Sequence, residues 1–253
     1  MICRVYNSFQ FRITLLLLIV SLFSCSKGHY CDCFISRGAN TSDIRTLPLF
    51  NTLKVYGKID VYFTQDSTLT ASKITVVTGS NLVSGISTNV TNGTLEIKNN
   101  NKCNFMRGEN NEITIYISAP KCTYFVQAGV GNIYTSNTLR QDTVDCTLTN
   151  NGDIHIAMNS TIAFTHTHGM GDVYFSGSVS NLFNNTQGQG FVEASNLTIQ
   201  NYSFFYFGSN GVAHVRCIGR LDVVVASTGN VYYSGNPTQL NPQITGSGAL
   251  IPE

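Results

Sequence analysis

The chain has 253 residues, only 11% of them charged, and its formal net charge is +1. Because phosphate binding needs clustered Lys and Arg, this balance excludes an electrostatic nucleic-acid binder, and the length suits one large or two small domains. Hydrophobic residues make up 42% of the chain and Trp is absent. The abundance of Thr, Ser, Asn, Gly, Val and Ile favours strands and turns over helices.

Residues 1–24 have the pattern of a bacterial lipoprotein signal peptide. Two positively charged residues, Arg4 and Arg12, precede the apolar run 13–23. This run is too short to span a bilayer, which takes about 20 apolar residues. The run ends at Ser24-Cys25, and a small residue directly before Cys resembles a lipobox. We therefore expect Cys25 to carry a lipid that anchors the protein to the outer membrane. The alternative is an ordinary cleaved signal peptide.

The segment after this signal is polar and without periodicity, so residues 25–46 are predicted to form a flexible tether. An exported chain permits disulfides, and the sequence leaves the pairing open. The favoured alternative is that the cysteines are mostly small buried apolar residues. The six cysteines that remain after the signal peptide and Cys25 are Cys31, Cys33, Cys103, Cys122, Cys146 and Cys217.

The head domain is predicted to span residues 47–253 and to begin with half-buried strands. Residues 50–63 alternate apolar and polar side chains around Gly57, which is typical of such strands. Asn92-Gly93 is a tight-turn signal between two further strand-like runs. Further runs occupy residues 74–77, 82–90, 95–98 and 112–117, with a loop at 99–111.

A repeat of 18 to 21 residues begins at about residue 120 and continues to residue 253. Each unit has a glycine that is usually followed by Asn or Asp and then by a β-branched residue. A glycine is required where φ is positive or where neighbouring coils approach closely, and Asn or Asp suits hydrogen bonding within the turn. The anchor glycines of the repeat are Gly131, Gly152, Gly171, Gly190, Gly211, Gly229 and Gly248.

The positions after each anchor glycine predict a strand with one buried face. Positions two and four after it are mostly apolar, and position three carries a polar atom after each of the first six anchors. A unit of this length cannot bury its apolar face alone, so stacked units must share a core. We predict an all-β, single-stranded right-handed parallel β-helix, a β-solenoid, in which the strands before residue 120 continue or cap the stack.

Several of these segments resemble the repeating units of the family described as putative auto-transporter adhesin, head GIN domain. The resemblance covers residues 47–251 and implies a β-helix of the pectate-lyase-like superfamily in the envelope of Gram-negative bacteria. It implies no catalytic residues. Phe191 and Val212 replace the usual Asn or Asp, so those turns are expected to differ. The segments are VYGKIDVYFTQ, NGTLEIK, AGVGNIY, NNGDIHI, HGMGDVYF, STGNVYYSGNP and ITGSGAL.

The column three residues after each anchor glycine is the candidate binding surface. Flat amphipathic side chains offer contact area at low entropic cost, so this column is predicted to contact a glycan or a surface protein. The alternative is simple β-propensity on a solvent face. Its members are Tyr134, His155, Tyr174, Glu193, His214 and Tyr232.

Three other constellations have simpler explanations. Asp153 and Asp172 occupy one column on adjacent turns, where carboxylate pairs serve hydrolysis or bind Ca²⁺, but turn capping explains them too. His166 and His168 are weak metal-ligand candidates because no third ligand is near in sequence. Glu193 and His214 fit an acid–base pair or a solvated surface pair. No metal or cofactor is expected.

These features favour a non-enzymatic cell-envelope lipoprotein, either an adhesin or a ligand-binding or structural module. Its expected partners are the membrane, through the lipid, and a glycan or surface protein, with no nucleic acid. The alternative is a carbohydrate-active β-helix enzyme, a polysaccharide lyase or hydrolase. Such enzymes line a groove with Asp, Lys and Arg, but the repeats hold only three scattered basic residues, Arg140, Arg216 and Arg220. An envelope sensor or scaffold is a third option.

Overall fold

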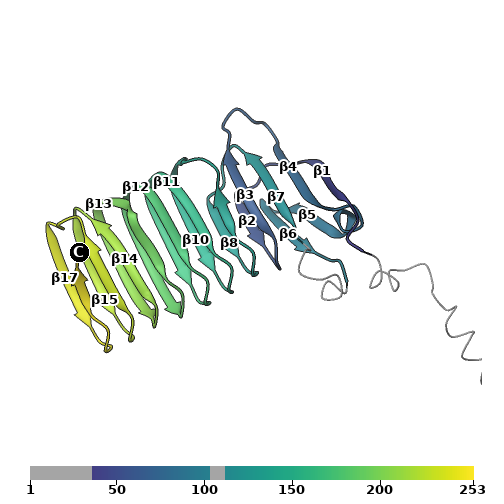
Figure 1. Cartoon of the computed structure of the whole chain (residues 1–253). Coiled ribbons are helices and arrows are strands. Elements are labelled where there is room, and N and C mark those ends of the chain that lie inside the picture. The colour runs from purple at the N-terminus through teal and green to yellow at the C-terminus, as the bar shows by residue number, and fades with distance from the viewer. Residues whose placement is uncertain (1–35, 103–111) are drawn as a thin grey trace, which may run out of the picture.

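The strands of the chain coil into an elongated solenoid, shown by a computed structural model that describes residues 36–102 and 112–253 (Figure 1). The signal peptide, Cys25, Cys31, Cys33 and Cys103 lie outside the described residues. Among the residues described, no helix is long and apolar enough to cross a membrane. The predicted β-solenoid is confirmed.

Each turn of the solenoid has two faces, which we call the first and second sheets. In spatial order the first sheet contains β4 (Ser72–Gly79), β7 (Thr114–Ala119), β3 (Asp60–Gln65), β9 (Ile133–Thr135), the first halves of β11 (Ile154–Thr167), β12 (Val173–Gly188) and β13 (Val192–Ser209), then β14 (Val212–Cys217), β16 (Asn230–Ser234) and β18 (Leu250–Pro252).

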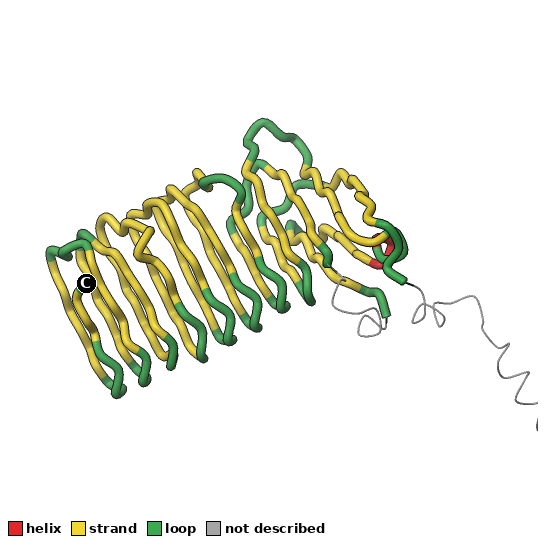
Figure 2. Tube along the Cα trace, viewed as in Figure 1, coloured by secondary structure: helices red, strands yellow, loops and turns green. Residues whose placement is uncertain are grey.

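The second sheet runs beside it, with one continuous apolar core between the two. It contains β5 (Ile86–Thr91), β6 (Thr94–Asn99), β2 (Thr52–Val55), β8 (Tyr124–Gln127), β10 (Leu139–Leu148), the second halves of β11, β12 and β13, then β15 (Arg220–Val225) and β17 (Gln239–Ile244). Figure 2 shows loops collected along one long edge of the solenoid, whereas β11, β12 and β13 run around the other edge as continuous strands.

From β8 onwards the strands of successive turns pair in parallel, as predicted. The alternation of apolar and polar residues explains this stacking. In β11, Ile154, Ile156 and Met158 are buried while His155 between them points outward. Since every turn repeats this pattern, each buries its inward side chains against the same columns of its neighbours.

The strands before residue 120 both continue and cap the stack, but not in chain order. The coil of β2 and β3 lies between the coil of β6 and β7 and the coil of β8 and β9. Beyond it, β4 pairs antiparallel with β7, and β5 pairs antiparallel with β6 through a hairpin at Asn92-Gly93, where φ is 49° and 73°. The predicted tight turn is therefore present, and antiparallel strands close this end of the solenoid.

The folded region begins earlier than predicted, because β1 (Asn40–Leu47) occupies the end of the expected tether. This strand pairs antiparallel with β4 along its whole length. Its Ile44 is 74% exposed, so the strand shows no apolar signal. Backbone pairing holds it, together with the Arg45 guanidinium, which donates to the Ile86 carbonyl at 2.7 Å and to Thr88 Oγ1 at 3.0 Å.

The anchor glycines are required by close approach between turns. A Cβ atom on Gly171 would lie 2.1 Å from the carbonyl oxygen of Gly152, and one on Gly152 would lie 1.9 Å from that of Gly131. Neither Gly152 nor Gly171 has a positive φ. Of the two reasons that the sequence left open for these glycines, the contact between coils is therefore the one that applies.

The three cysteines within the described ranges, Cys122, Cys146 and Cys217, are buried and form no disulfide. Burial raises the pKa of the Cys122 and Cys146 thiols well above the usual range, and that of Cys217 to about 11. All three are therefore protonated and unreactive at neutral pH, in agreement with the interpretation of cysteine as a small apolar residue.

Candidate functional site

The six residues of the predicted binding column lie on neighbouring strands of the first sheet, and all are half-buried. We call them the Tyr/His column. In each case the residue pairs with its counterpart on the next turn, so the column is continuous in register. The order is Tyr134, His155, Tyr174, Glu193, His214 and Tyr232.

Rings of the Tyr/His column stack face to face. The ring centroids of Tyr134 and His155 are 4.6 Å apart, and those of His155 and Tyr174 are 4.3 Å apart with planes 1° from parallel. The stack also contains Tyr62, 5.0 Å from Tyr134, and Tyr116, 5.4 Å from Tyr62. Because stacking covers the ring faces, the surface presents ring edges and hydroxyl groups.

Sequence reasoning missed Tyr62 and Tyr116 because their coils precede the glycine repeat. A signal was present, since Asp60-Val61-Tyr62 has the same pattern as Asn132-Ile133-Tyr134. The anchor position before it holds Ile59 instead of glycine, which hid the match. The carbonyl oxygen of Ile59 would lie 2.1 Å from a Cβ on Gly131, so the two positions are stacked.

Glu193 interrupts the aromatic stack. Its carboxylate accepts hydrogen bonds from the backbone N–H of Ser195 at 3.0 Å and from the Ser195 hydroxyl. The next residue in the column, His214, lies 3.0 Å from a carboxylate oxygen of Glu253 and stacks on Tyr232 at 5.0 Å. Glu193 and His214 are register partners, but each side chain bonds elsewhere, so the structure does not assemble them as an acid–base pair.

Beside the column, the residues directly after the anchor positions form a second ladder. Asp60 Oδ1 accepts the N–H of Asn132 at 2.9 Å, and Asn132 Oδ1 accepts the N–H of Asp153 at 2.9 Å. Asp153 Oδ1 then accepts the N–H of Asp172, and Asp172 Oδ1 that of Phe191, both at 2.8 Å. The expected hydrogen bond within each turn is therefore wrong, because the bond joins one turn to the next.

This ladder gives Asp153 and Asp172 a structural role that needs neither catalysis nor Ca²⁺ binding, since one oxygen of each carboxylate accepts a hydrogen bond from a backbone amide. Asp172 also accepts from the Tyr174 hydroxyl through Oδ2 at 3.3 Å, which ties the ladder to the column. Burial, and to a lesser degree the two carboxylates, raise the pKa of Tyr174. Burial lowers the pKa of His155, and the carboxylates oppose that change only in part.

His166 and His168, the candidate metal ligands, lie close together in the chain at the end of β11. They flank the buried Thr167 at the end of β11, and both face outward. Among the described residues, no group of three His, Cys, Asp or Glu side chains is placed to hold a metal ion.

A second aromatic row, which the sequence analysis missed, lies on the outer face of the second sheet. Phe164, Phe183 and Phe204 are register partners on β11, β12 and β13. We call them the phenylalanine row. Phe164 and Phe183 stack at 5.3 Å. The row borders an open groove of about 510 Å³, whose other side chains are His166, Asn184, Asn185, Gln187 and Tyr206.

The signal for the phenylalanine row was hidden by a change of spacing. Phe164 and Phe183 follow Gly152 and Gly171 by twelve residues each, but Phe204 follows Gly190 by fourteen. The pairing of β12 with β13 shifts register between Tyr174 and Ser176 and again between Val179 and Asn181. Each shift accommodates one extra residue of β13, as β-bulges do.

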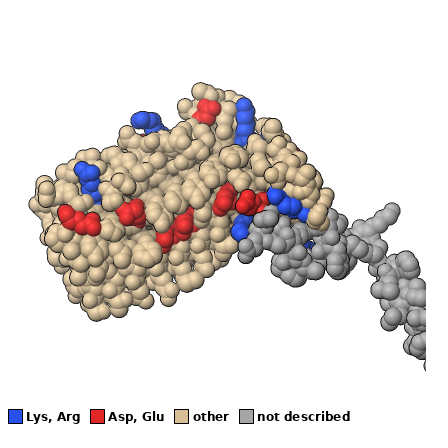
Figure 3. All heavy atoms as spheres, viewed as in Figure 1, with Lys and Arg blue, Asp and Glu red and all other residues tan. Residues whose placement is uncertain are grey.

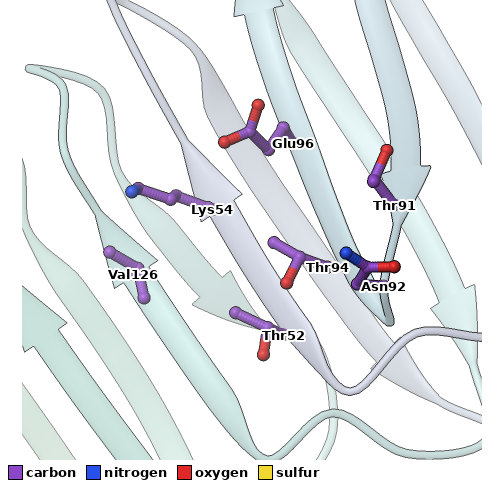
Figure 4. Close-up of a pocket in the computed structure, with 7 residues that line it drawn as sticks. All are labelled: Thr52, Lys54, Thr91, Asn92, Thr94, Glu96 and Val126. Carbon is purple, nitrogen blue, oxygen red and sulfur yellow. The ribbon is translucent and has the colours of Figure 1, made fainter.

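Another open depression, of about 590 Å³, lies nearer the N-terminal end, over β2, β6 and β8 (Figure 4). Lys54 and Glu96 project over it from neighbouring strands. Glu96 accepts from Lys98 and from the Tyr56 hydroxyl, and the ammonium groups of Lys54 and Lys98 lie 5.2 and 4.8 Å from the Tyr56 ring centre. The Glu96 carboxylate thus offsets part of the positive charge of Lys54 and Lys98. Figure 3 shows acidic side chains in a line along the length of the visible face, with fewer Lys and Arg side chains scattered around them.

The model of the family described as "Putative auto-transporter adhesin, head GIN domain" matches residues 49–237, more than half of the chain. The chain belongs to this family. The match covers the coils from β2 to β16 and therefore includes both the Tyr/His column and the phenylalanine row. No curated protein sequence matches the chain.

Solved structures share the fold of this head GIN domain protein. A putative adhesin from Bacteroides fragilis is 20% identical with a TM-score of 0.74, covering 87% of this chain and 100% of its own. A putative adhesin and a putative lipid binding protein, both from Parabacteroides distasonis, have TM-scores of 0.64 and 0.65. They are 18% and 17% identical, and cover 85% and 86% of this chain and 98% of their own. At these identities the likeness establishes the fold.

Proposed function

We propose that this protein is a non-enzymatic adhesion module of the cell envelope of a Gram-negative bacterium. A lipid on Cys25 holds it at the outer membrane, and the Tyr/His column contacts a glycan or protein on another surface. Membership of the adhesin family supports the envelope setting. The lipobox-like Ser24-Cys25 supports the anchor.

The observation that carries the proposal is the continuous ring stack from Tyr116 through Tyr62, Tyr134 and His155 to Tyr174. These side chains are already ordered, so a partner that binds them costs little further side-chain entropy. Five rings over four strand steps extend about 19 Å at about 4.8 Å per step. An extended partner lying along the solenoid meets a row of hydroxyls and ring edges.

A non-catalytic role is supported by the positions of the most suggestive carboxylates. Asp153 and Asp172 each accept a backbone N–H of the following turn. A screen of the purified chain on acidic polysaccharides tests this part. Turnover that disappears in Asp153→Asn would replace the adhesion proposal with the enzyme alternative.

The adhesion test compares cells that carry the wild-type chain, a deletion, Tyr134→Ala or the control Tyr124→Ala. Tyr124 is an exposed tyrosine on the second sheet, away from the column. We expect the deletion and Tyr134→Ala to reduce attachment to glycan- or protein-coated surfaces several-fold. At most interfaces a few aromatic side chains supply most of the binding free energy, so truncating one of them to Ala weakens binding strongly. Equal attachment by the deletion strain and the wild type would reject the proposal.

The anchor has a separate test. Cys25→Ala is expected to move the protein from the membrane fraction to the soluble fraction of cells, because the lipid supplies the membrane affinity. If Cys25→Ala stays with the membrane, the anchoring part of the proposal is wrong and the binding part stands on its own result.

A further inference from the structure

The groove beside the phenylalanine row has the composition of a ligand site and plays no part in the Tyr/His column, which lies on the other sheet. Its apolar floor is formed by Phe164, Phe183 and Phe204, and Phe204 remains 38% exposed. Exposed aromatic rings side by side on a sheet are costly to leave in water. A ligand that covers them gains this area as binding free energy.

The rim of the groove supplies hydrogen-bonding groups without a fixed charge. Asn185 and Tyr206 are register partners two residues beyond the row, and His166 precedes them on β11. Asn185 Oδ1 accepts from Gln187 at 3.3 Å. The Asn185 amide nitrogen, the Tyr206 hydroxyl and the His166 ring have no hydrogen-bond partner in the described part of the chain, so all three are available to a ligand.

The ring contacts change at the step from β12 to β13. Phe183 stacks on Phe164 but meets Tyr202 edge-on, at 5.7 Å and 71°. No ring contact joins Phe183 to its register partner Phe204 among the described residues. The register shift between Val179 and Asn181 explains this, since a bulge re-aims the side chains that follow it. Phe204 therefore stands apart from the stack, at the groove.

Acidic residues flank the phenylalanine row at both ends. Asp145 precedes Phe164 in the row and Asp222 follows Phe204. Asp222 is neutralised by Arg220, whose guanidinium lies 2.7 Å away, and burial raises the pKa of Asp145. The aromatic part thus spans three strands, a length of about 10 Å at about 4.8 Å per strand.

We propose that this groove binds a neutral saccharide chain that runs along the solenoid axis. Aromatic rings match the C–H faces of pyranose rings, and the amide, imidazole and phenol groups match their hydroxyls. The lining has no Lys or Arg side chain to pair with the carboxylates of an acidic glycan. A lipid tail has no groups that could hydrogen-bond with the polar rim. The strand spacing is close to the length of one hexopyranose unit, so each of three turns meets one unit.

The test uses the purified full chain and calorimetric titration with cello-, malto- and chito-oligosaccharides of one to five units. Oligogalacturonate and phosphatidylcholine vesicles are the acidic and lipid probes. The variants are Phe204→Ala and Asn185→Ala. The control is Gln243→Ala, an exposed amide in the same column as Asn185 but on the last strand of the second sheet.

We expect at least one neutral series to bind, with affinity rising up to three units and level beyond. Phe204→Ala should weaken it at least about fivefold, as truncation of an aromatic anchor does, and Asn185→Ala should weaken it without altering the fold. Gln243→Ala should leave it unchanged. The proposal is overturned if no neutral series binds, if both groove variants bind normally, or if oligogalacturonate or vesicles bind as tightly through the same residues. Tyr134→Ala should not alter this binding, which separates it from adhesion through the column.

Discussion

The contact between anchor glycines predicts a large effect of one methyl group, in Gly171→Ala. The added Cβ would lie 2.1 Å from the Gly152 carbonyl oxygen and 2.9 Å from its carbon, both backbone atoms that no side-chain rotation can move. To reach even 3.0 Å, the two turns must separate locally by about 0.9 Å. Overpacking that moves backbone costs typically about 1–3 kcal/mol, and more where hydrogen bonds break.

The hydrogen bonds that such a separation stretches are known. Gly171 N–H donates to Asn150 O at 3.2 Å, Ile154 N–H to Asp172 O at 3.0 Å, and Asp172 N–H to Asp153 Oδ1 at 2.8 Å. Lengthening by about 0.9 Å takes all three beyond bonding distance. At about 1 kcal/mol each, their loss destabilises the fold by about 3 kcal/mol.

The assay is urea unfolding followed by circular dichroism, with Gly57→Ala and Gly57→Asn as matched controls. Gly57 has open space around its Cβ position but a φ of 76°, so Ala there should cost only about 1–2 kcal/mol of backbone strain and Asn less. At Gly171, Asn should be as harmful as Ala, because the contact is steric. If Gly171→Asn is tolerated as well as Gly57→Asn, the close-approach argument is wrong.

Three further predictions follow from the ladder, the column and the buried thiols. Asp153→Ala removes the acceptor for the Asp172 amide and should lower the unfolding free energy by about 1–2 kcal/mol, whereas Asp153→Asn keeps an acceptor and should be nearly neutral in urea titration. Burial lowers the pKa of His155 below 6.5, so the unfolded chain binds more protons just below pH 6.5 and stability falls as the pH drops through that range. His155→Phe keeps a ring in the stack and should flatten this dependence of denaturation midpoint on pH; an unchanged slope would place the titration elsewhere. Cys217, with a pKa of about 11, should resist iodoacetamide at pH 8 in the native protein and react on unfolding, as peptide mass spectrometry can follow.

The stacked turns were predictable from sequence because glycine spacing records where two backbones touch. A side chain at Gly152 or Gly171 would collide with the backbone of the neighbouring turn, so the contact requires glycine there and can be recognised in a single sequence. The order of the first coils requires no particular residue type, so the sequence does not reveal it. β2 and β6 have the same alternation of apolar and polar residues, so this pattern does not show which of them lies next to β8. β1 was missed for a related reason, since backbone pairing alone requires no apolar pattern.

The Tyr/His column was predictable in its repeat portion because position three follows the glycine at fixed distance. Its extension to Tyr62 was hidden by Ile59 at the anchor position. The reading of Asp153 as a residue bonded within its own turn failed because sequence gives spacing along the chain, whereas the carboxylate reaches the neighbouring turn. The donor that the carboxylate meets there is the Asp172 amide of the stacked coil, at 2.8 Å.

Both aromatic rows change at the same strand, and this links the two proposed binding surfaces. The interval from Gly190 to Gly211 is 21 residues, two more than the interval before it. β13 accommodates these residues at two register shifts, one beside Glu193, where the Tyr/His column is interrupted, and one before Phe204, where the phenylalanine row opens. These two extra residues interrupt the pairing of β12 with β13 twice and separate Phe204 from the stack of Phe164 and Phe183. Bulges that persist at such a cost are typical of places where a side chain is re-aimed for function. Shortening this turn by deleting Ser195 and Gln200 should therefore bring Phe204 onto the stack of Phe164 and Phe183 and stabilise the fold in urea, while it weakens saccharide binding beside Phe204. The Tyr/His column should stay interrupted, since Glu193 carries no ring and already pairs in register with Tyr174 and His214.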